Sequence, residues 1–418
     1  MSQPPHFRRR EFLKGASALG AFGALGPTPA RSFVPPLWAP RAETEVAVIG
    51  AGPWGRNITS ELFALEGAKV VAVADPVESR LASALRKAPG AKGFANLAEV
   101  RAAFPDLGAV FVATPSHLHA AVAIEALEAN LGVYCEAPMA TTPADLDAIE
   151  AAVQGSLSAF TCGLLARTNP LYAHARDFVR SGAILDLVTF RGQHHEKTSW
   201  LSPARDPKDQ AALNWRLDPE VSLGLAGELG VHQFDVFHWF LGEYPTAVTG
   251  NGSLQVYKDR RGVFDTIGLD FEYSNERRLC YDATLANSFE KRYEQFCGTA
   301  GTIKMAQNAG WLFKESDAPT LGFEVYAGRE HFHDEEGITL VVDATKLAAQ
   351  ERLKEGVGLQ EPPLRFALKA FLTSVQEGSD SSCDAAEGAR AARVAIAANE
   401  AIRSGKRVEL DPKDFVRD

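Results

Sequence analysis

Residues 45–55 read Glu-Val-Ala-Val-Ile-Gly-Ala-Gly-Pro-Trp-Gly, and this stretch decides the fold of the first half of the chain. Its first five residues form a short apolar run that suits a buried parallel strand. Apolar side chains at helical spacing follow from Arg56 to Glu66. A strand, a G-x-G-x-x-G turn and a helix in this order predict a cradle for the pyrophosphate of a dinucleotide. The residues that we expect to bind this cofactor are Gly50, Gly52, Pro53, Trp54 and Gly55. A purely structural glycine turn is the alternative.

A second apolar run, residues 69–74, ends at Asp75, which lies 20 residues beyond Gly55. A carboxylate at this position accepts hydrogen bonds from the adenine ribose and repels a 2′-phosphate, so NAD is favoured over NADP. Further apolar runs at 109–113 and 132–135 alternate with helical segments, which predicts a doubly wound parallel sheet. Ligands bind at the carboxyl ends of such strands. The residues that follow these two runs therefore join the predicted cofactor site: Thr114, Pro115 and Glu136.

The composition of the 418 residues excludes two classes of protein. With 46% hydrophobic and 23% charged residues the chain is not mainly disordered, and its length predicts two or three domains. The formal net charge of −10 argues against nucleic acid as a partner, because phosphate binding needs a basic face. This charge is uneven, since residues 1–30 carry +3 and the remainder −13.

The basic N-terminus has the pattern of an export signal. A basic segment precedes a weakly apolar, glycine-rich stretch at 15–26 and small residues at 28–30. The hexapeptide Arg-Arg-Glu-Phe-Leu-Lys at 9–14 resembles the twin-arginine signal R-R-x-F-L-K. We expect residues 1–42 to be a signal peptide and linker that engages the twin-arginine export machinery, delivers a folded protein to the periplasm and leaves no stable membrane anchor. A disordered basic tail is the alternative.

Three polar side chains in a later segment stand at helical spacing. Glu228, His232 and Asp235 occupy positions i, i+4 and i+7, so they share one face if the segment is helical. A histidine flanked by carboxylates suits general acid–base catalysis near neutral pH. A polar helix face with a satisfied histidine is the alternative. The five cysteines match no zinc or C-x-x-C spacing, so we predict no metal site. Three of them lie in apolar runs, which favours buried thiols, although an exported protein could pair two.

Together these motifs resemble the glucose–fructose oxidoreductase, inositol dehydrogenase and MocA-like (Gfo/Idh/MocA) family. The matching segments are GAGPWG at 50–55, ADP at 74–76, ATPSHLH at 113–119, CEAP at 135–138, GLAGELGVHQFD at 224–235 and SGKRVEL at 404–410. The resemblance implies an α/β fold with an NAD-binding Rossmann domain at 43–165. It implies a C-terminal α/β domain at 166–418 with a large, mostly antiparallel sheet and a closing helix near 384–404. It also implies a homo-oligomer.

The resemblance assigns roles to single residues. His232 matches the catalytic histidine, Glu228 fills a position usually held by a catalytic aspartate, and Asp235 supports them or binds substrate. His119 and Arg167 match positions near the cofactor. The segment Trp215-Arg216 matches residues that line the substrate site.

One departure concerns the E-K-P triplet of relatives that oxidise sugar hydroxyls, which here is Glu136-Ala137-Pro138. Alanine cannot replace the lysine that lies near the substrate hydroxyl and the nicotinamide. His232 could act alone, or a cation from the second domain could substitute. Lys197, which follows His194 in the run 193–197, is the best candidate, although this run could also be a polar loop.

We therefore expect an exported, NAD-dependent, oxidoreductase-like enzyme that acts on a sugar, polyol or glycoside. Because free NAD is scarce outside the cytoplasm, we expect a tightly bound cofactor and a redox-neutral cycle. Two alternatives stay open: an ordinary soluble sugar dehydrogenase with exchangeable NAD, and a non-catalytic NAD- and sugar-binding protein, which Ala137 favours.

Overall fold

The structure is a computed structural model that describes residues 43–325, 327–342, 347, 349–350, 352 and 357–415. The predicted signal peptide and linker, residues 1–42, lie outside the described residues. No described helix has both the length and the apolar character that a membrane span requires.

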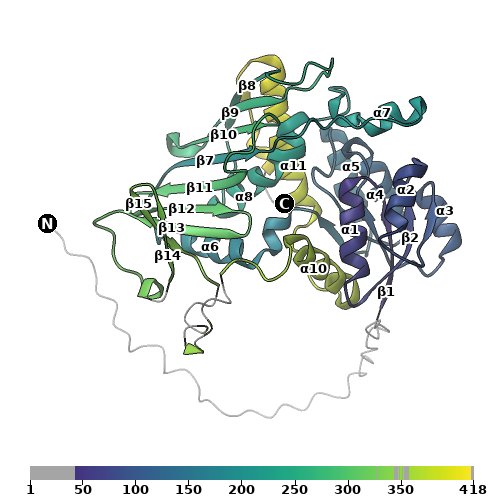
Figure 1. The fold of residues 1–418 in the computed structure, drawn as a ribbon, viewed down its shortest axis with the longest axis horizontal. Helices are drawn as coiled ribbons and strands as arrows, with labels where there is room; N and C mark the ends of the chain where they lie inside the picture. Colours follow the sequence, from purple (N-terminus) through teal and green to yellow (C-terminus); the bar gives the residue numbers. More distant parts are fainter. Residues whose placement is uncertain are drawn as a thin grey trace, which may run out of the picture. The chain divides into compact units, whose positions relative to one another are not determined.

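The first part of the described chain is the predicted doubly wound parallel sheet (Figure 1). The strand order is β3-β2-β1-β4-β5-β6 and every pairing is parallel. The order reverses between β1 and β4, and such a reversal marks where ligands bind in sheets of this kind. The strands are β1 (Thr44–Ile49), β2 (Ala68–Ala74), β3 (Lys92–Phe94), β4 (Ala109–Val112), β5 (Gly132–Cys135) and β6 (Phe160–Cys162).

Helices cover both faces of this sheet. Helix α1 packs on one face, where Ile58 and Leu62 contact Val48 of β1 and Phe111 of β4 in one buried cluster. Helices α3, α4 and α5 bury their apolar sides in the cluster on the other face. The elements are α1 (Pro53–Phe63), α2 (Glu78–Leu85), α3 (Leu97–Ala103), the 3-10 turn η1 (Ser116–Leu118), α4 (His119–Glu128) and α5 (Pro143–Gln154).

The second part is a ten-stranded sheet in the order β14-β15-β13-β12-β11-β7-β10-β9-β8-β16. Only the pair β7–β10 is parallel among the described pairings, so the expected mostly antiparallel sheet is confirmed. Its strands are β7 (Leu187–His195), β8 (Ala247–Ser253), β9 (Thr266–Glu272), β10 (Arg278–Thr284), β11 (Arg292–Gly298), β12 (Gly301–Ala306), β13 (Ala309–Lys314), β14 (Arg329–Phe332), β15 (Glu335–Thr339) and β16 (Val408–Glu409).

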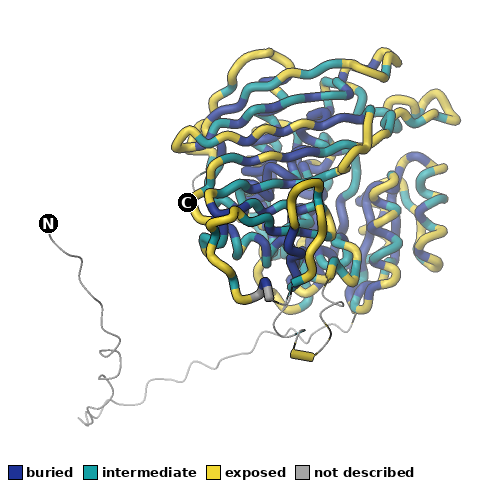
Figure 2. Tube along the Cα trace, turned by 60° about the vertical axis from the view of Figure 1, so that its left-hand side comes forward, coloured by how far each residue is buried: buried dark blue, intermediate teal, exposed yellow. Residues whose placement is uncertain are grey.

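Helices cover one face of this second sheet and leave side chains of the other face accessible, which Figure 2 shows as alternating buried and exposed positions along the strands. Phe190, Phe237 and Phe296 pack their rings together between the sheet and α8. The helical elements are η2 (Leu165–Thr168), α6 (Pro170–Arg180), η3 (Pro207–Asp209), α7 (Gln210–Leu213), η4 (Trp215–Leu217), the π-helical turn η5 (Ala226–Gly230), α8 (Val231–Leu241), η6 (Ser274–Glu276) and η7 (Gly322–Val325).

The last helices join the two sheets. Helix α10 (Pro363–Glu377) lies against the first sheet, where Phe371 meets the rings of Phe111 and Tyr134. Helix α11 (Ala385–Ser404) contacts α5 and β6 of the first sheet and also α8 and β8 of the second. The turn η9 (Pro412–Phe415) follows β16. A helix thus spans the region where a closing helix was expected, while α10 had no counterpart in the sequence-based expectation.

Candidate active site

The turn after β1 fits only glycine at two positions. Gly50 has a φ of +101°, and a Cβ there would lie 2.4 Å from the carbonyl oxygen of Ala113 after β4. A Cβ on Gly55 would lie 1.9 Å from the carbonyl oxygen of Gly50. By contrast, a Cβ on Gly52 would meet nothing within 4 Å in the described structure, so open space lies beside the start of α1.

This open space fits the pyrophosphate of a dinucleotide. Helix α1 starts at Pro53, and within the described residues it has no side-chain cap and no acidic residue in its first turn. Its unpaired N–H groups and the positive end of its dipole therefore face the space that Gly52 leaves open.

Asp75, which directly follows β2, is hydrogen-bonded to the glycine turn. Asp75 is 7% exposed, and its Oδ2 accepts a hydrogen bond of 2.7 Å from the backbone N–H of Ala51. Its Oδ1 accepts one of 2.8 Å from the N–H of Val77. Each carboxylate oxygen keeps a second lone pair. Ribose binding by Asp75 stays a prediction. Its two hydrogen bonds show that Asp75 also holds the turn in shape.

His119 links the loop after β4 to the loop after β5. Its Nδ1 lies 2.9 Å from the carbonyl oxygen of Pro138, and its Nε2 lies 2.8 Å from that of Thr114. Burial lowers the pKa of His119 to about 4, although the two carbonyls favour the protonated ring. Because both ring nitrogens face backbone oxygens, His119 positions these loops, and any direct contact with the cofactor would involve its carbon atoms.

Glu136 at the end of β5 is a buried acid with an unsatisfied oxygen. The residue is 6% exposed, and its Oε1 has no hydrogen-bond partner in the described chain. Burial raises the pKa of Glu136 to about 8, against the opposing effect of the Trp54 indole. Trp54 itself is 38% exposed at the start of α1. The Oγ1 of Thr114 is likewise buried without a described partner. Such orphaned polar atoms beside the glycine turn are those that a bound cofactor would satisfy.

Glu228 connects the second part of the molecule to the first. It lies in the π-helical turn η5, and its Oε1 accepts a hydrogen bond of 3.0 Å from the Oγ of Ser116 in η1, directly after β4. Its Oε2 accepts one of 3.2 Å from the Nε of Arg216. Burial raises the pKa of Glu228, and Arg216 and Ser116 oppose this effect. The predicted acid–base segment therefore reaches the strand ends where the cofactor is expected.

Arg216 is the cation that forms an ion pair with Glu228. Its guanidinium carbon lies 4.8 Å from the centre of the Trp215 ring and 5.8 Å from that of Trp200. Trp215 is 8% exposed, so it packs as well as lines this region. Lys197, the cation that the sequence favoured, is exposed, and its backbone N–H donates to the Oγ of Ser288. The geometry therefore favours Arg216 over Lys197 as the cation from the second domain.

His232 in the first turn of α8 lies among basic groups. Burial lowers its pKa to about 3, and Arg292 and His194 lower it further. Within the described chain it forms no hydrogen bond or ion pair with Glu228 or Asp235. The π-helical turn explains this difference, because a wider turn before α8 changes the i, i+4 geometry that an α-helix would give.

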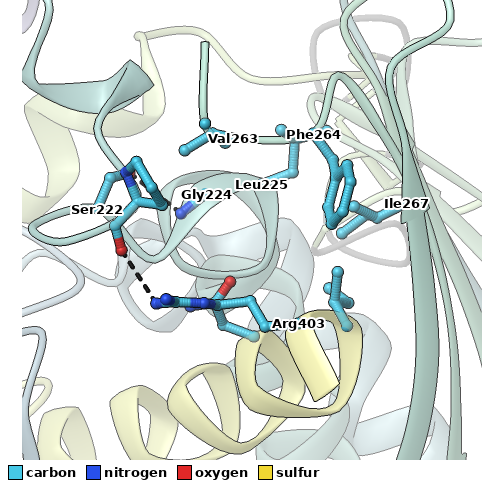
Figure 3. Close-up of a pocket in the computed structure, with 11 residues that line it drawn as sticks. Ser222, Gly224, Leu225, Val263, Phe264, Ile267 and Arg403 are labelled. Atoms are coloured by element: carbon cyan, nitrogen blue, oxygen red, sulfur yellow. Dashed lines mark hydrogen bonds between the residues drawn. The ribbon is translucent and has the colours of Figure 1, made fainter. Parts of the chain in front are cut away.

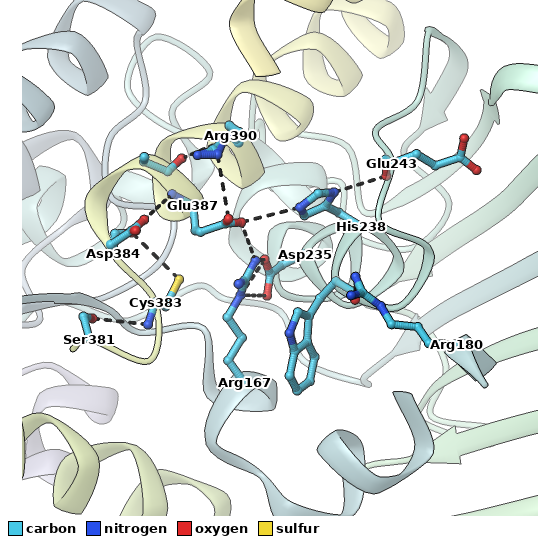
Figure 4. A network of polar contacts seen from close by, with 12 residues as sticks. Arg167, Arg180, Asp235, His238, Glu243, Ser381, Cys383, Asp384, Glu387 and Arg390 are labelled. Atoms are coloured by element: carbon cyan, nitrogen blue, oxygen red, sulfur yellow. Dashed lines mark hydrogen bonds and ion pairs between the residues drawn. The ribbon is translucent and has the colours of Figure 1, made fainter. Parts of the chain in front are cut away.

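Asp235 and Arg167 pair with each other, deep in the protein (Figure 4). The Nε of Arg167 lies 3.1 Å and 3.0 Å from the two oxygens of Asp235, and its Nη2 lies 2.6 Å from Oδ1. The same Nη2 donates to Oε2 of Glu387 at 2.8 Å. Glu387 also pairs with His238 at 3.5 Å and Arg390 at 3.7 Å. This network ties η2, α8 and α11 together, so it gives the catalytic candidate Asp235 and the cofactor candidate Arg167 a shared structural role.

The structure thus separates the predicted residues into three groups. Glu228 joins Arg216, His232 lies with His194, and Asp235 lies with Arg167. Two neighbours were not foreseen as site residues. Ser116 lies within the ATPSHLH segment and could have been found by its place after a strand end. Arg292 had no such signal, because only strand pairing brings it opposite His194.

A small cavity lies apart from these groups (Figure 3). It has a volume of about 30 Å³ and is lined by Ser222, Leu225, Val263, Ile267 and Arg403 among others. Such a volume accommodates roughly one water molecule. A sugar therefore does not fit there. No group of described residues has the donors for a metal ion.

Comparison with known proteins matches both parts of the chain. Residues 44–161 match the family model "Oxidoreductase family, NAD-binding Rossmann fold", and residues 194–410 match "Oxidoreductase family, C-terminal alpha/beta domain". The chain belongs to the GFO/IDH/MocA oxidoreductase family. The first match, together with the glycine turn and its open space, makes NAD the cofactor of this family member.

Individual relatives match only parts of the chain at low sequence identity. A levoglucosan dehydrogenase from Pseudarthrobacter phenanthrenivorans is 31% identical over 141 residues, 34% of each chain. A 2,7-anhydro-N-acetylneuraminate hydratase from Mediterraneibacter gnavus is 24% identical over 261 residues, 62% of this chain and 66% of the relative. The chain therefore spans less than two thirds of either relative. The structure of a levoglucosan dehydrogenase with NADH and levoglucosan has a TM-score of 0.69 at 22% identity, over 88% of this chain and 99% of the other, and shows the same fold.

Proposed function

We propose that this family member is an exported, NAD-dependent oxidoreductase that acts on a sugar, polyol or glycoside with a retained cofactor and a redox-neutral cycle. The hydrogen bond between Glu228 and Ser116 carries the proposal. It joins the segment with the candidate acid–base residues to the end of β4, where ligands of doubly wound sheets bind. Names among the relatives support the reaction class, since one is a dehydrogenase of a sugar and another a hydratase.

The residues that would hold NAD are those around the open space beside α1. The N–H groups of the first turn of α1 would bind the pyrophosphate, and Asp75 the adenine ribose. Glu136 and Thr114 each offer a buried polar atom without a described partner. When bound, NAD accepts a hydride from a carbinol carbon and can return it.

His232 is the group that we propose to take the substrate's hydroxyl proton. A pKa of about 3 keeps its imidazole neutral at physiological pH, so a lone pair is available to accept a proton. The same low pKa makes His232 a weak base in the unliganded protein. A bound substrate must therefore change its surroundings for proton transfer to be efficient.

Arg216 takes the role that Ala137 leaves open. Its guanidinium is held by Glu228 on one side and by two indole rings. An arginine cannot release a proton at neutral pH, so it serves here as a fixed positive charge that orients a substrate oxygen. This distinguishes the proposed site from one with a lysine, which can also transfer a proton.

Export completes the proposal. The segment Arg9-Arg10-Glu11-Phe12-Leu13-Lys14 would direct the folded, cofactor-loaded protein to the periplasm. A redox-neutral cycle then regenerates the cofactor at each turnover, and the hydratase name of one relative describes a reaction without net oxidation. Replacing both arginines with lysine should leave the protein in the cytoplasmic fraction. A variant that still reaches the periplasm would contradict the export route.

We also propose that the chain forms a homo-oligomer through the uncovered face of the second sheet. Arg191 on β7 and Cys280 on β10 pair across the two strands and are both exposed, so this face presents side chains to solvent. Sedimentation of the purified protein tests the proposal, and a monomer at all concentrations would reject it.

The central experiment measures the cofactor and the reaction separately. Protein purified without added NAD is denatured, and the released NAD is quantified; about one per chain is expected. The variant His232→Ala should lose turnover and keep its NAD. His331, an exposed histidine on β14, provides the matched control, since His331→Ala should keep both. Absence of NAD would favour an ordinary dehydrogenase with exchangeable cofactor. Retained NAD with no reaction on any sugar would favour the non-catalytic protein that Ala137 suggests.

A further inference from the structure

A buried basic cluster lies between the second sheet and α8. His194 on β7 and Arg292 on β11 are directly paired across the antiparallel strands. Gly192, two residues before His194, faces α8, because a Cβ there would lie 3.0 Å from a ring carbon of Phe237. His194 and Arg292 therefore share the face that α8 covers. His232 of α8 lies beside the same cluster, because the Nε2 of the next residue, Gln233, donates a hydrogen bond of 2.8 Å to the backbone oxygen of Tyr293, which follows Arg292.

Arg292 leaves the end of its guanidinium unused. Its Nε donates to Oε1 of Glu294 at 3.0 Å, and the Oε2 of Glu294 accepts from the hydroxyl of Tyr172 at 2.6 Å. The side chain of Glu294 is fully buried, whereas that of Arg292 is 19% exposed. In the described part of the chain, the two terminal nitrogens of Arg292 have no hydrogen-bond partner. A planar pair of N–H donors that solvent can reach is the group that binds a carboxylate bidentately.

Two further polar atoms beside Arg292 lack partners. The Nδ1 of His194 and the hydroxyl of Tyr281 are buried without a hydrogen bond to any described residue. Tyr281, which pairs with Gly192 across β10 and β7, is only 2% exposed. Buried polar groups are nearly always satisfied in native proteins, so these atoms point to a ligand that completes them.

The nearby carboxylates are already engaged and cannot be that ligand. Glu294 is shared by Arg292 and Tyr172, Asp282 pairs with His195, and Asp235 pairs with Arg167. Glu228 is bound by Arg216 and Ser116. None of these carboxylates is therefore left to pair with the terminal nitrogens of Arg292.

We propose that this cluster binds the carboxylate of an acidic sugar, with the two terminal N–H groups of Arg292 forming a bidentate pair and His194 and Tyr281 completing it. The inference rests on the proposed function and names the substrate class of the same site. A phosphorylated sugar fits less well, because a dianion would face a single arginine that Glu294 already half neutralises.

A bound carboxylate would also remedy the weakness of His232 as a base. Arg292 opposes protonation of His232 in the unliganded protein. A negative charge on Arg292 offsets that field, so the pKa of His232 rises toward its usual value. An acidic substrate thus activates the base that removes its own proton.

The test compares sugars that differ only at C6. Protein loaded with NAD is mixed with D-glucuronate or D-galacturonate and, in parallel, with D-glucose or D-galactose, and reduction of the bound nicotinamide is followed by absorbance. We expect the second-order rate constant of nicotinamide reduction to be roughly 10- to 100-fold higher for the uronates, as a charged bidentate contact implies. The variant Arg292→Lys should lose most of this preference, so its ratio of uronate to neutral-sugar rate constants should fall toward one.

Two controls keep the result interpretable. Arg191→Lys changes an exposed arginine of the same strand β7 as His194 and should keep the preference. His194→Gln preserves the charge pair of Arg292 and Glu294 and should reduce the preference, which provides a second variant if Arg292→Lys does not fold. Thermal stabilisation by each sugar measures binding without turnover.

The outcomes separate the two proposals. Equal rates with uronates and neutral sugars, or stronger binding of glucose 6-phosphate than of glucuronate, would overturn the acidic-sugar assignment and leave the oxidoreductase proposal intact. Stabilisation by uronates that Arg292→Lys abolishes, with no nicotinamide reduction by any sugar, would support the carboxylate site and reject the proposed activity. If the uronates neither stabilise the protein nor reduce its nicotinamide, the carboxylate site is rejected.

Discussion

Replacing Arg167 with methionine should lower the free energy of unfolding by about 3–5 kcal/mol, the range found when one partner of a buried ion pair is removed. The pair of Arg167 and Asp235 is a buried ion pair in the structure. The exposed side-chain fractions are 8% for Arg167, 1% for Asp235 and 9% for Glu387. The variant would leave two carboxylates buried without their shared cation. Since the stability of native proteins is about 5–15 kcal/mol, this loss is a large part of the total.

Urea unfolding of the variants separates charge from geometry. Arg167→Lys keeps the charge but loses the planar fork that contacts both oxygens of Asp235, so we expect a smaller loss of about 1.5–3 kcal/mol. The double variant Arg167→Met with Asp235→Leu removes both members of the main pair and should be more stable than Arg167→Met alone. Arg191→Met, at an exposed position, should change stability by less than about 0.5 kcal/mol.

The result that would refute this reasoning concerns the cofactor. The sequence placed Arg167 among the residues that bind NAD, a prediction that its ion pairs with Asp235 and Glu387 do not test. If Arg167→Met unfolds at the same urea concentration as the wild type but releases its NAD, Arg167 is a cofactor ligand and the network adds little stability. Equal stability of the single and double variants would also show that no buried charge is left uncompensated.

Four further outcomes follow from the site. Once NAD is removed from both proteins, Gly52→Ala should have the thermal stability of the wild type, yet as purified it should retain at least about tenfold less NAD, because its Cβ would fill only the open space for the pyrophosphate; unchanged NAD content would place the pyrophosphate elsewhere. Burial raises the pKa of Glu136 from 4.5 to about 8, so the wild type should lose stability as pH rises through this window, and urea unfolding should show Glu136→Gln gaining up to about 5 kcal/mol relative to it. A constant difference across pH would show that Glu136 does not titrate there. Arg216→Gln should slow the reaction at saturating sugar by roughly 10-fold or more, because the fixed positive charge proposed to orient the substrate oxygen is lost; a change in KM alone would make Arg216 a binding residue. The reaction should require neutral His232, so its rate rises with pH through the pKa of His232, and the rising limb should lie at higher pH for a uronate than for a neutral sugar.

Local spacing made the first half of the fold predictable. The glycines at 50, 52 and 55 are dictated by contacts within a short segment and with the neighbouring strand, so the sequence pattern carries nearly all the information. The two-sheet architecture followed from alternation of apolar residues and from the family resemblance. Helix α10 escaped prediction because its place on the first sheet depends on Phe371 meeting Phe111 and Tyr134, which lie more than 200 residues earlier.

The site was harder to predict for a related reason. Helical spacing suggested that Glu228 and Asp235 flank His232, but each carboxylate has a partner from another segment. Ser116 and Arg216 bind Glu228, and Arg167 binds Asp235. Such pairings depend on the packing of separate elements, and the π-helical turn before α8 carries no simple sequence signature. Residue types at the site were therefore predictable, whereas their partners were not.

The surroundings of His232 bear directly on how the proposed base works. A histidine that works beside a carboxylate is poised to take a proton before substrate arrives. Here the candidate carboxylates hold the two sheets together, and the groups that act on His232 are Arg292 and His194. In the proposed mechanism the base is therefore weak until negative charge enters the cluster. A substrate that supplies this charge is selected at the proton-transfer step as well as by binding, so discrimination against neutral sugars should be found mainly in kcat.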